Sequence, residues 1–202
     1  MTAHRALFGL GPITGKTVLV TGGAGAVGFY AIQLAKWAGA RVIATVSSAE
    51  KGELARRAHA DAVIYYQSEN VAERVMSFTG GAGVDHVVDV DFGANLKATL
   101  ACLKDKGSIA TYASMSRPEP AIPFYALMFK NICLEWVFVY EMAQSSIDDA
   151  ARDVNAWLSR GTVVLPTFKT FPLERTAEAH AAVEKGAIGK VLIECGGEAV
   201  RV

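Results

Sequence analysis

The chain has 202 residues, of which 51% are hydrophobic, and its 20 Lys and Arg residues balance its 20 Asp and Glu residues. Balanced charge gives no indication of a nucleic-acid partner or of an anionic membrane surface. A chain of this length and hydrophobic content can bury one substantial core, so we expect a globular protein with a small-molecule site.

The cysteine and histidine residues indicate neither a metal site nor a disulfide framework. Cys102, Cys133 and Cys195 are far apart, and no C-x-x-C pair or metal-ligand spacing links them to the four histidines. This usage suits a reducing compartment. The most apolar stretch, residues 124–142, is interrupted by charged residues, and the N-terminus lacks the apolar core of a signal peptide. We therefore expect a cytoplasmic protein with no membrane span and no bound metal.

Short β-branched segments alternate with longer segments of helical spacing along the chain. We expect strands over residues 17–21, 41–46, 62–66, 84–90, 108–112 and 132–140. We expect helices over residues 26–38, 49–58, 71–78, 94–103 and 146–159, and a proline-containing loop over residues 114–123. This alternation predicts an α/β protein with a Rossmann-type, doubly wound parallel sheet of about six strands and helices on both faces.

The order of the expected elements changes after Gly161. A strand over residues 163–170, a helix near residues 173–184 and a last strand over residues 190–194 are expected there. We assign residues 1–168 to a nucleotide-binding domain and residues 169–202 to a short C-terminal extension.

A glycine-rich segment, TGGAGAVG, separates the first expected strand from the first expected helix, and Gly23, Gly25 and Gly28 have the Gly-x-Gly-x-x-Gly spacing. In dinucleotide-binding proteins the first glycine permits a tight turn, the second lets a diphosphate approach the backbone, and the third lets helix and strand pack closely. The helix N-terminus then offers unpaired amides to an anion. Glycine-rich turns also occur without a nucleotide, but the buried strand before this one and the amphipathic helix after it predict dinucleotide binding.

The residues after the second expected strand favour NADPH over NADH. NAD-binding versions carry an Asp or Glu at this point, which binds the ribose hydroxyls, whereas this chain has Ser47 and Ser48. Without a carboxylate to repel it, a 2′-phosphate could be bound by the serine hydroxyls and by Lys51. The alternative is that Lys51 only lies on a solvated helix face. We predict NADPH as the cofactor.

Strand, glycine loop and helix together (TVLVTGGAGAVGFYAIQLAKWAGARVIAT) resemble the cofactor domain of the medium-chain dehydrogenases/reductases. The resemblance is strongest to the zinc-independent quinone oxidoreductases, the zeta-crystallin-like group, and covers nearly the whole chain. It implies hydride transfer from the nicotinamide to a small acceptor such as a quinone or an enone. It assigns no catalytic residue.

The resemblance also implies which residues bind the cofactor. The diphosphate turn falls on Ala24, Gly25, Ala26 and Val27, and the adenosine-phosphate contacts fall on Ser47, Ser48, Lys51 and Tyr66. A polar contact falls on Asn95, in the loop after the fourth strand, and the nicotinamide is flanked by Ala113 and Ser114 and by Val139 and Tyr140. Alternatively, Tyr66 closes a strand end and residues 137–139 belong to the core.

In the family that the chain resembles, a catalytic domain precedes the segment similar to residues 1–12. We therefore expect this chain alone to bind NADPH but to reduce quinones slowly or not at all. Two alternatives stay open, namely a non-enzymatic module that binds or senses NADPH and a fragment of a zinc-type alcohol dehydrogenase. A short-chain dehydrogenase is disfavoured because no tyrosine is followed four residues later by a lysine.

The sixth expected strand, residues 132–140, carries an expectation about assembly. In the family that the chain resembles, this edge pairs with its copy across a two-fold axis, and an apolar edge strand left unpaired is an aggregation liability. We expect a homodimer through this strand. The alternative is that the helix over residues 146–159 covers it.

Overall fold

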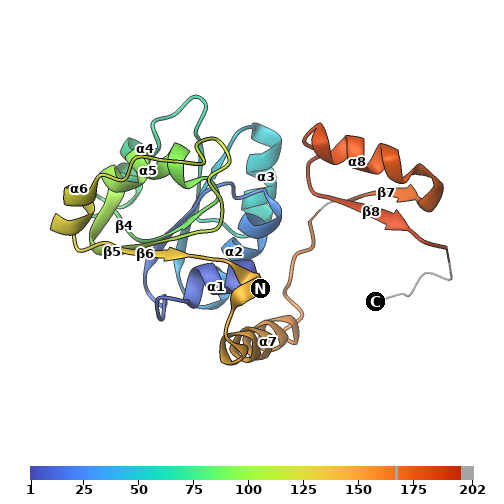
Figure 1. Ribbon diagram of the computed structural model, residues 1–202, viewed down its shortest axis with the longest axis horizontal. Coiled ribbons are helices and arrows are strands. Elements are labelled where there is room, and N and C mark those ends of the chain that lie inside the picture. Colours follow the sequence, from blue (N-terminus) through green and yellow to red (C-terminus); the bar gives the residue numbers. More distant parts are fainter. Residues whose placement is uncertain (167, 197–202) are drawn as a thin grey trace. The chain divides into compact units, whose positions relative to one another are not determined.

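The computed structural model describes residues 1–166 and 168–196. The chain divides into two compact units, Met1–Val164 and Leu165–Val202 (Figure 1). This division lies slightly before the boundary at residue 168 that the sequence pattern suggests.

Six parallel strands form the sheet of the first unit. They are β1 (Thr17–Val20), β2 (Arg41–Val46), β3 (Ala62–Tyr65), β4 (Val84–Asp89), β5 (Leu103–Thr111) and β6 (Cys133–Trp136). Their order across the sheet is β3-β2-β1-β4-β5-β6. The chain therefore proceeds outwards from β1 in one direction and then outwards from β4 in the other, which places the switch point of the sheet between these two strands. The predicted Rossmann-type α/β fold is confirmed.

The two strands beside the switch point are also the centre of the core. Leu19 of β1 lies opposite Ile43 of β2 on one side and Val87 of β4 on the other, and all three side chains are fully buried. Helices on both faces of the sheet (Figure 1) remove both sides of these strands from water, which explains why β1 is apolar at consecutive positions rather than at alternate ones.

Five helices lie close to their expected ranges: α2 (Ala26–Trp37), α3 (Ala49–Arg57), α4 (Val71–Phe78), α5 (Phe92–Cys102) and α7 (Gln144–Leu158). Two more, α1 (Thr2–Phe8) and α6 (Phe124–Phe129), lie in segments for which the pattern predicts none. Each is two turns or less, which is too short to establish a 3.6-residue period.

The prediction of a sixth strand over residues 132–140 is wrong beyond Trp136. β6 pairs only with β5, from Ser108↔Cys133 to Thr111↔Trp136, so the strand ends where its single partner ends. Val139 and Tyr140 lie instead in the 3₁₀ turn η1 (Val139–Glu141). An edge strand has no second neighbour that could hold these apolar residues in an extended conformation.

Three residues of α1, namely His4, Arg5 and Ala6, make polar contacts with the rest of the unit. The Ala6 carbonyl oxygen lies 2.7 Å from Nε2 of the buried His86 on β4, whose Nδ1 in turn lies 2.7 Å from the Ser108 hydroxyl of β5. Arg5 forms an ion pair with Glu135 on β6, and the His4 ring contacts Asp153 on α7. The first helix therefore joins elements that are far apart in the sequence.

In the second unit, β7 (Phe168–Pro172) pairs in parallel with β8 (Lys190–Glu194), and η2 (Leu173–Arg175) and α8 (Thr176–Glu184) connect them. Phe171 and Ala179 are buried there. The last strand agrees with its expected range, whereas the strand expected over residues 163–170 is extended only from Phe168 among the residues that the structure describes.

The contacts of His86 predict a pH-dependent stability. Burial lowers the pKa of His86 to about 4, so the neutral ring is the folded form, with Nε2–H donating to Ala6 and Nδ1 accepting from Ser108. In the unfolded chain the His86 ring is protonated below about pH 6.5, whereas in the folded chain it stays neutral down to about pH 4. The folded state therefore loses stability relative to the unfolded state as the pH falls from 6.5 towards 4. The free energy of unfolding should decrease by about 3 kcal/mol across this window.

Denaturant titrations at several pH values measure this effect. His86→Gln keeps a donor for Ala6 and should remove the pH-dependent part, while His180→Gln, at an exposed position of α8, should retain the wild-type profile. A His86→Gln profile as steep as that of the wild type would contradict the assignment.

Candidate functional site

The carboxyl ends of the parallel strands meet along one edge of the sheet, and ligands of doubly wound proteins bind in the crevice outside the switch point. Here that point lies between the ends of β1 and β4, at Val20 and Asp89. The residues that follow these two strands therefore define the candidate site.

The glycine turn after β1 is fixed by backbone conformation and by close packing. Gly22 has φ +65°, in the left-handed region that favours glycine. A Cβ at Gly28 would lie 2.3 Å from the carbonyl oxygen of Gly22, so only glycine fits there. Gly28 has the expected packing role. Gly23 lies within the tight turn, which the Gly25 amide closes by donating to the Gly22 carbonyl oxygen at 2.9 Å, but it is Gly22 that takes the left-handed conformation. A Cβ at Gly23 would lie 2.7 Å from that of Ala44.

The N-terminus of α2 is suited to an anion. Gly25 is its N-cap residue and supplies no side-chain hydrogen bond, and the first turn contains no acidic residue. The first amides of a helix have no partner within the helix, and the helix dipole favours negative charge at this end. Ala26, the first residue of α2, and the preceding Gly25 are exposed, so an anion can approach the backbone closely.

Ser47, Ser48 and Lys51 lie together at the end of β2. The Lys51 Nζ donates to the Ser47 hydroxyl at 3.0 Å, and the Ser48 hydroxyl accepts from the Lys51 amide at 3.3 Å as the N-cap of α3. All three side chains are partly exposed. The structure thus places two hydroxyls and one ammonium group beside the glycine turn, since β2 is the neighbour of β1.

Tyr66 follows β3 and is half exposed, and its amide donates to the Val46 carbonyl oxygen at the end of β2. Tyr65 has a different role. Its hydroxyl accepts from Arg56 at 2.8 Å, and the same guanidinium contacts Glu53. Arg56 is therefore engaged in polar contacts within the protein, whereas the Lys51 ammonium group donates only to the Ser47 hydroxyl among the described residues.

A buried carboxylate organises the other side of the switch point. The Oδ1 of Asp89, the last residue of β4, accepts from the Thr21 hydroxyl at 3.1 Å, the Asn95 amide group at 2.8 Å and the Asp91 backbone N–H at 2.9 Å. Its Oδ2 is buried without a hydrogen-bond partner among the described residues. Burial raises the pKa of Asp89 above its usual value.

Asn95 lies in the first turn of α5 rather than in a loop after β4, which corrects the expected setting of this residue. The helix begins at Phe92 because the Phe92 amide donates to the Ala113 carbonyl oxygen and the Gly93 amide donates to the Ser114 hydroxyl. The Asn95 side chain is thereby directed to Asp89. The sequence pattern did not identify Thr21 and Asp89 as site residues. The position of Asp89, a carboxylate at the end of a buried parallel strand, could have indicated a role at this edge of the sheet.

A small pocket of about 250 Å³ lies at the ends of β5 and β6. Ala113 and Ser114 line it, as expected for residues flanking a ring, and Phe92 and Trp136 contribute aromatic walls with ring centroids 5.3 Å apart. From the following segment Val137 and Phe138 line the pocket. Tyr140, by contrast, is 84% exposed within its 3₁₀ turn.

Two further features bear on the class of site. Among residues 1–166 and 168–196, no three His, Cys, Asp or Glu side chains are grouped so that they could hold a metal ion. Within the same part of the chain, every helix is too short or too polar to cross a bilayer.

Comparison with known proteins places the chain among dehydrogenases. Residues 26–156 match the family model described as zinc-binding dehydrogenase. A 2-haloacrylate reductase from Burkholderia sp is 33% identical over 170 residues, which make up 82% of this chain and 51% of that protein. The chain spans about half the length of these curated relatives, including a quinone oxidoreductase from Pseudomonas aeruginosa.

Solved structures share the fold. The quinone oxidoreductase of Escherichia coli, complexed with NADPH, has a TM-score of 0.82 and 26% identity, over 96% of this chain and 62% of that one. An NAD-dependent alcohol dehydrogenase has a TM-score of 0.84 and 30% identity, over 96% of this chain and 56% of that one.

The family match covers more than half of the chain and includes α2, the ends of β2 and β4, and both sides of the small pocket. The chain therefore belongs to the zinc-binding dehydrogenase family within the medium-chain dehydrogenases/reductases, and it corresponds to their cofactor-binding domain.

Proposed function

We propose that the unit Met1–Val164 binds NADPH and serves a reductase that transfers hydride to a small acceptor such as a quinone or an enone. The observation that carries this proposal is the uncapped N-terminus of α2 beside the cluster of Ser47, Ser48 and Lys51. Two relatives, a 2-haloacrylate reductase and a quinone oxidoreductase, support the reaction class.

The described residues fit this cofactor. Gly28 packs closely against the Gly22 carbonyl oxygen, and Gly25 and Ala26 at the start of α2 are exposed, so the amides there would hold the diphosphate. No acidic residue occurs in the first turn of α2, and β2 ends at Val46 and is followed by Ser47 rather than by a carboxylate. Ser47, Ser48 and Lys51 would then bind the 2′-phosphate, and Tyr66 would lie beside the adenosine.

The chain's own groups would orient the reacting end and exclude water from it. Bound NADPH supplies the hydride. The pocket at the ends of β5 and β6 would hold the nicotinamide against Ala113 and Ser114, with Phe92 and Trp136 as its apolar walls. We assign Val139 and Tyr140 to the rim of this site. Asn95 would support the crevice at the switch point through its hydrogen bond to Asp89.

Three wider features of the function are also proposals. We place the reaction in the zinc-independent branch, because the motifs resemble quinone oxidoreductases, and residues 169–202 in the part that packs against the catalytic domain of the family. We place the protein in the cytoplasm, where the three free cysteines would stay reduced.

The similarity to an NAD-dependent alcohol dehydrogenase favours a second candidate, a domain of an alcohol dehydrogenase. A non-enzymatic module that binds or senses NADPH is a third. Tighter binding of NADH than of NADPH would favour the alcohol dehydrogenase. Oxidation of NADPH by a quinone or an enone at any measurable rate, even the slow one expected of this chain, would exclude the non-enzymatic module.

Replacement of Lys51 tests the choice of cofactor. The wild type should bind NADPH more tightly than NADH, and Lys51→Glu should weaken NADPH binding by roughly tenfold, because it replaces an attractive charge at the 2′-phosphate with a repulsive one. NADH binding should change little. Calorimetric titration measures both affinities. Arg56→Gln is the matched control on the same helix and should preserve the preference for NADPH. Equal affinities for the two cofactors, unchanged in Lys51→Glu, would contradict the proposal.

A negative charge at the start of α2 should separate cofactor binding from stability. Ala26→Glu places a carboxylate in the exposed first turn, where the helix dipole stabilises it by about 0.3–1 kcal/mol, so the melting temperature should stay the same or rise. The same carboxylate should repel the diphosphate and weaken NADPH binding by roughly tenfold.

Thermal melts and calorimetry measure the two effects of Ala26→Glu. Ser145→Glu, which adds the same charge near the start of α7, should leave NADPH binding unchanged. Undiminished NADPH binding by Ala26→Glu would rule out this helix terminus as the diphosphate site.

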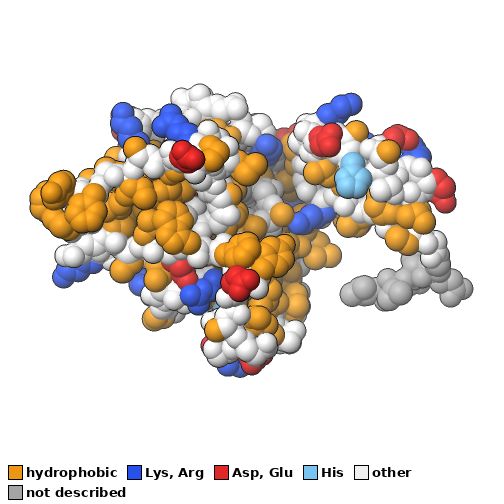
Figure 2. All heavy atoms as spheres, viewed as in Figure 1, with side chains coloured by type: hydrophobic (Ala, Val, Ile, Leu, Met, Phe, Trp, Pro, Cys, Tyr) orange, Lys and Arg blue, Asp and Glu red, His pale blue; other side chains and the backbone are white. Residues whose placement is uncertain are grey.

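We further propose that the chain forms a homodimer through β6. This strand is an edge of the sheet. Large exposed side chains lie before it, at its end and after it: Phe124, Tyr125 and Phe129 on α6, Trp136 at the end of β6, and Phe138 and Tyr140 beyond it. Figure 2 shows hydrophobic side chains gathered over α6. An exposed apolar edge of this kind favours pairing with a second copy.

Light scattering should therefore give twice the mass of one chain for the wild type. Cys133→Lys places a charge at an exposed position of β6 and should shift the protein to monomers, because lysine on an edge strand opposes pairing. A strictly monomeric wild type would overturn the assignment.

A further inference from the structure

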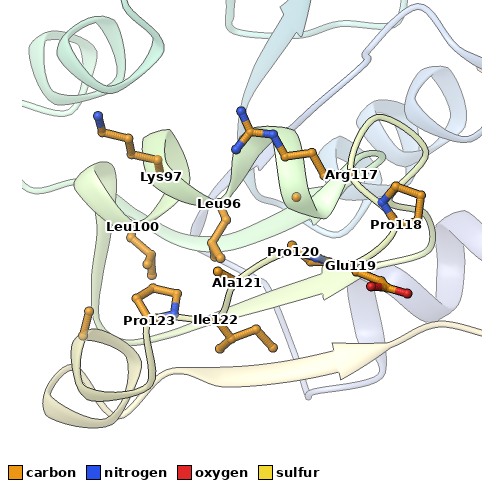
Figure 3. Close-up of a pocket in the computed structure, with 12 residues that line it drawn as sticks. Leu96, Lys97, Leu100, Arg117, Pro118, Glu119, Pro120, Ala121, Ile122 and Pro123 are labelled. Carbon is orange, nitrogen blue, oxygen red and sulfur yellow. The ribbon is translucent and has the colours of Figure 1, made fainter.

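One cavity of the first unit does not belong to the crevice at the switch point. Its volume is about 1010 Å³, and it lies between α5 and the segment that leads from β5 to α6. Leu96, Lys97 and Leu100 line it from α5, and residues 117–123 line it from the opposite side (Figure 3). The glycine turn and the cluster at Lys51 contribute no lining residue. This volume is at the upper end of the range of small-molecule sites.

The wall opposite α5 is built to hold its shape. It contains Pro118, Pro120 and Pro123, whose fixed φ angles restrict the loop. The Ser114 hydroxyl ties the beginning of the loop to α5, since it donates to the Arg117 carbonyl oxygen at 2.5 Å and accepts from the Gly93 amide at 3.0 Å. A Cβ at Gly93 would contact Arg117 at 2.6 Å, so the loop approaches the helix as closely as glycine allows.

The interior of the cavity and its rim differ in character. Leu96, Leu100 and the 47% exposed Ile122 give it an apolar lining, whereas Lys97 and Arg117 carry cationic groups along one side of it (Figure 3). Neither cationic side chain has an ion-pair or hydrogen-bond partner among the described residues. Glu119 is the acidic residue of the lining, and its carboxylate points away from the two cations in Figure 3.

We propose that this cavity is a second binding site, for an amphipathic carboxylate. The apolar tail of such a molecule would lie between Leu100 and Ile122, where burial of hydrocarbon supplies most of the affinity. Its carboxylate would lie between Lys97 and Arg117, whose guanidinium is suited to bidentate contact with a carboxylate. A molecule with only one of these two parts would leave either the apolar lining or the two cations without a partner. Because the cavity shares no lining residue with the glycine turn or the Lys51 cluster, this ligand is distinct from the dinucleotide, and its binding does not depend on it.

Three probes separate the two contributions. Calorimetric titration with dodecanoate tests the complete ligand, dodecanol tests the tail without the charge, and acetate tests the charge without the tail. Dodecanoate should bind, acetate should not bind measurably, and dodecanol should bind more weakly than dodecanoate. All titrations are made below the critical micelle concentration, on the full chain, with light scattering at the same protein concentration.

Variants locate the binding. The double variant Lys97→Gln/Arg117→Gln should bind dodecanoate roughly five- to tenfold more weakly, as expected for the loss of two partly exposed ion pairs, and should bind dodecanol like the wild type. Ala126→Trp, which fills the cavity from α6, should weaken the binding of both molecules. Lys185→Gln, an exposed charge change in the second unit, is the matched control and should bind dodecanoate like the wild type.

Three results would overturn the proposal. The first is the absence of dodecanoate binding, and the second is equal binding of dodecanoate and dodecanol. The third is self-association that buries the cavity, recognised by a dodecanoate affinity that falls as the fraction of dimer rises. NADPH affinity measured on the same variants should stay at the wild-type value, so a failure of this site is distinguishable from a failure of the cofactor site.

Discussion

The close packing of Gly28 against the carbonyl oxygen of Gly22 is the constraint on which the cofactor side of the candidate site depends. With no room for a Cβ between them, the first turn of α2 lies directly against the turn that leaves β1. The helix therefore begins over the carboxyl end of the sheet, at its switch point, with its unpaired amides exposed. Ser47 and Lys51 lie next to this position because β2 is the parallel neighbour of β1. The adjacent positions proposed for the diphosphate and the 2′-phosphate thus follow from one steric constraint and one strand pairing.

The opposite side of the switch point is held by polar groups that are removed from water. Asp89 gathers the Thr21 hydroxyl, the Asn95 amide and a backbone N–H on one oxygen, while its other oxygen is buried without a partner among the described residues. A buried carboxylate in this state costs stability, and its raised pKa reflects the same cost. In return it connects the end of β1, the end of β4 and the first turn of α5. The crevice is therefore bounded on one side by close backbone packing and on the other by a hydrogen-bond network.

Ser114 links two cavities of different chemistry. It lines the small aromatic pocket at the ends of β5 and β6, and its hydroxyl joins α5 to the proline-rich wall of the large cavity. The segment after β5 consequently serves both the proposed nicotinamide site and the proposed carboxylate site. The exposed aromatic residues of α6 line neither cavity, which leaves them available for contact between copies of the chain, whereas Phe138 after β6 lines the small pocket.

The sequence by itself determined the alternation of strands and helices, the glycine turn and the absence of an acid after β2, because each of these depends on neighbours in the chain and on intrinsic conformational preference. It predicted the doubly wound sheet, and it predicted that Ser47, Ser48 and Lys51 form one phosphate-binding site. Only the tertiary structure decided that Gly22, not Gly23, takes the left-handed conformation, that β6 ends at Trp136, and that Asn95 is directed to Asp89. It also placed His86 against α1 and opened the cavity between Leu100 and Ile122. These features join residues that are distant in the sequence, and local pattern holds no information on which of them become neighbours when the core is packed.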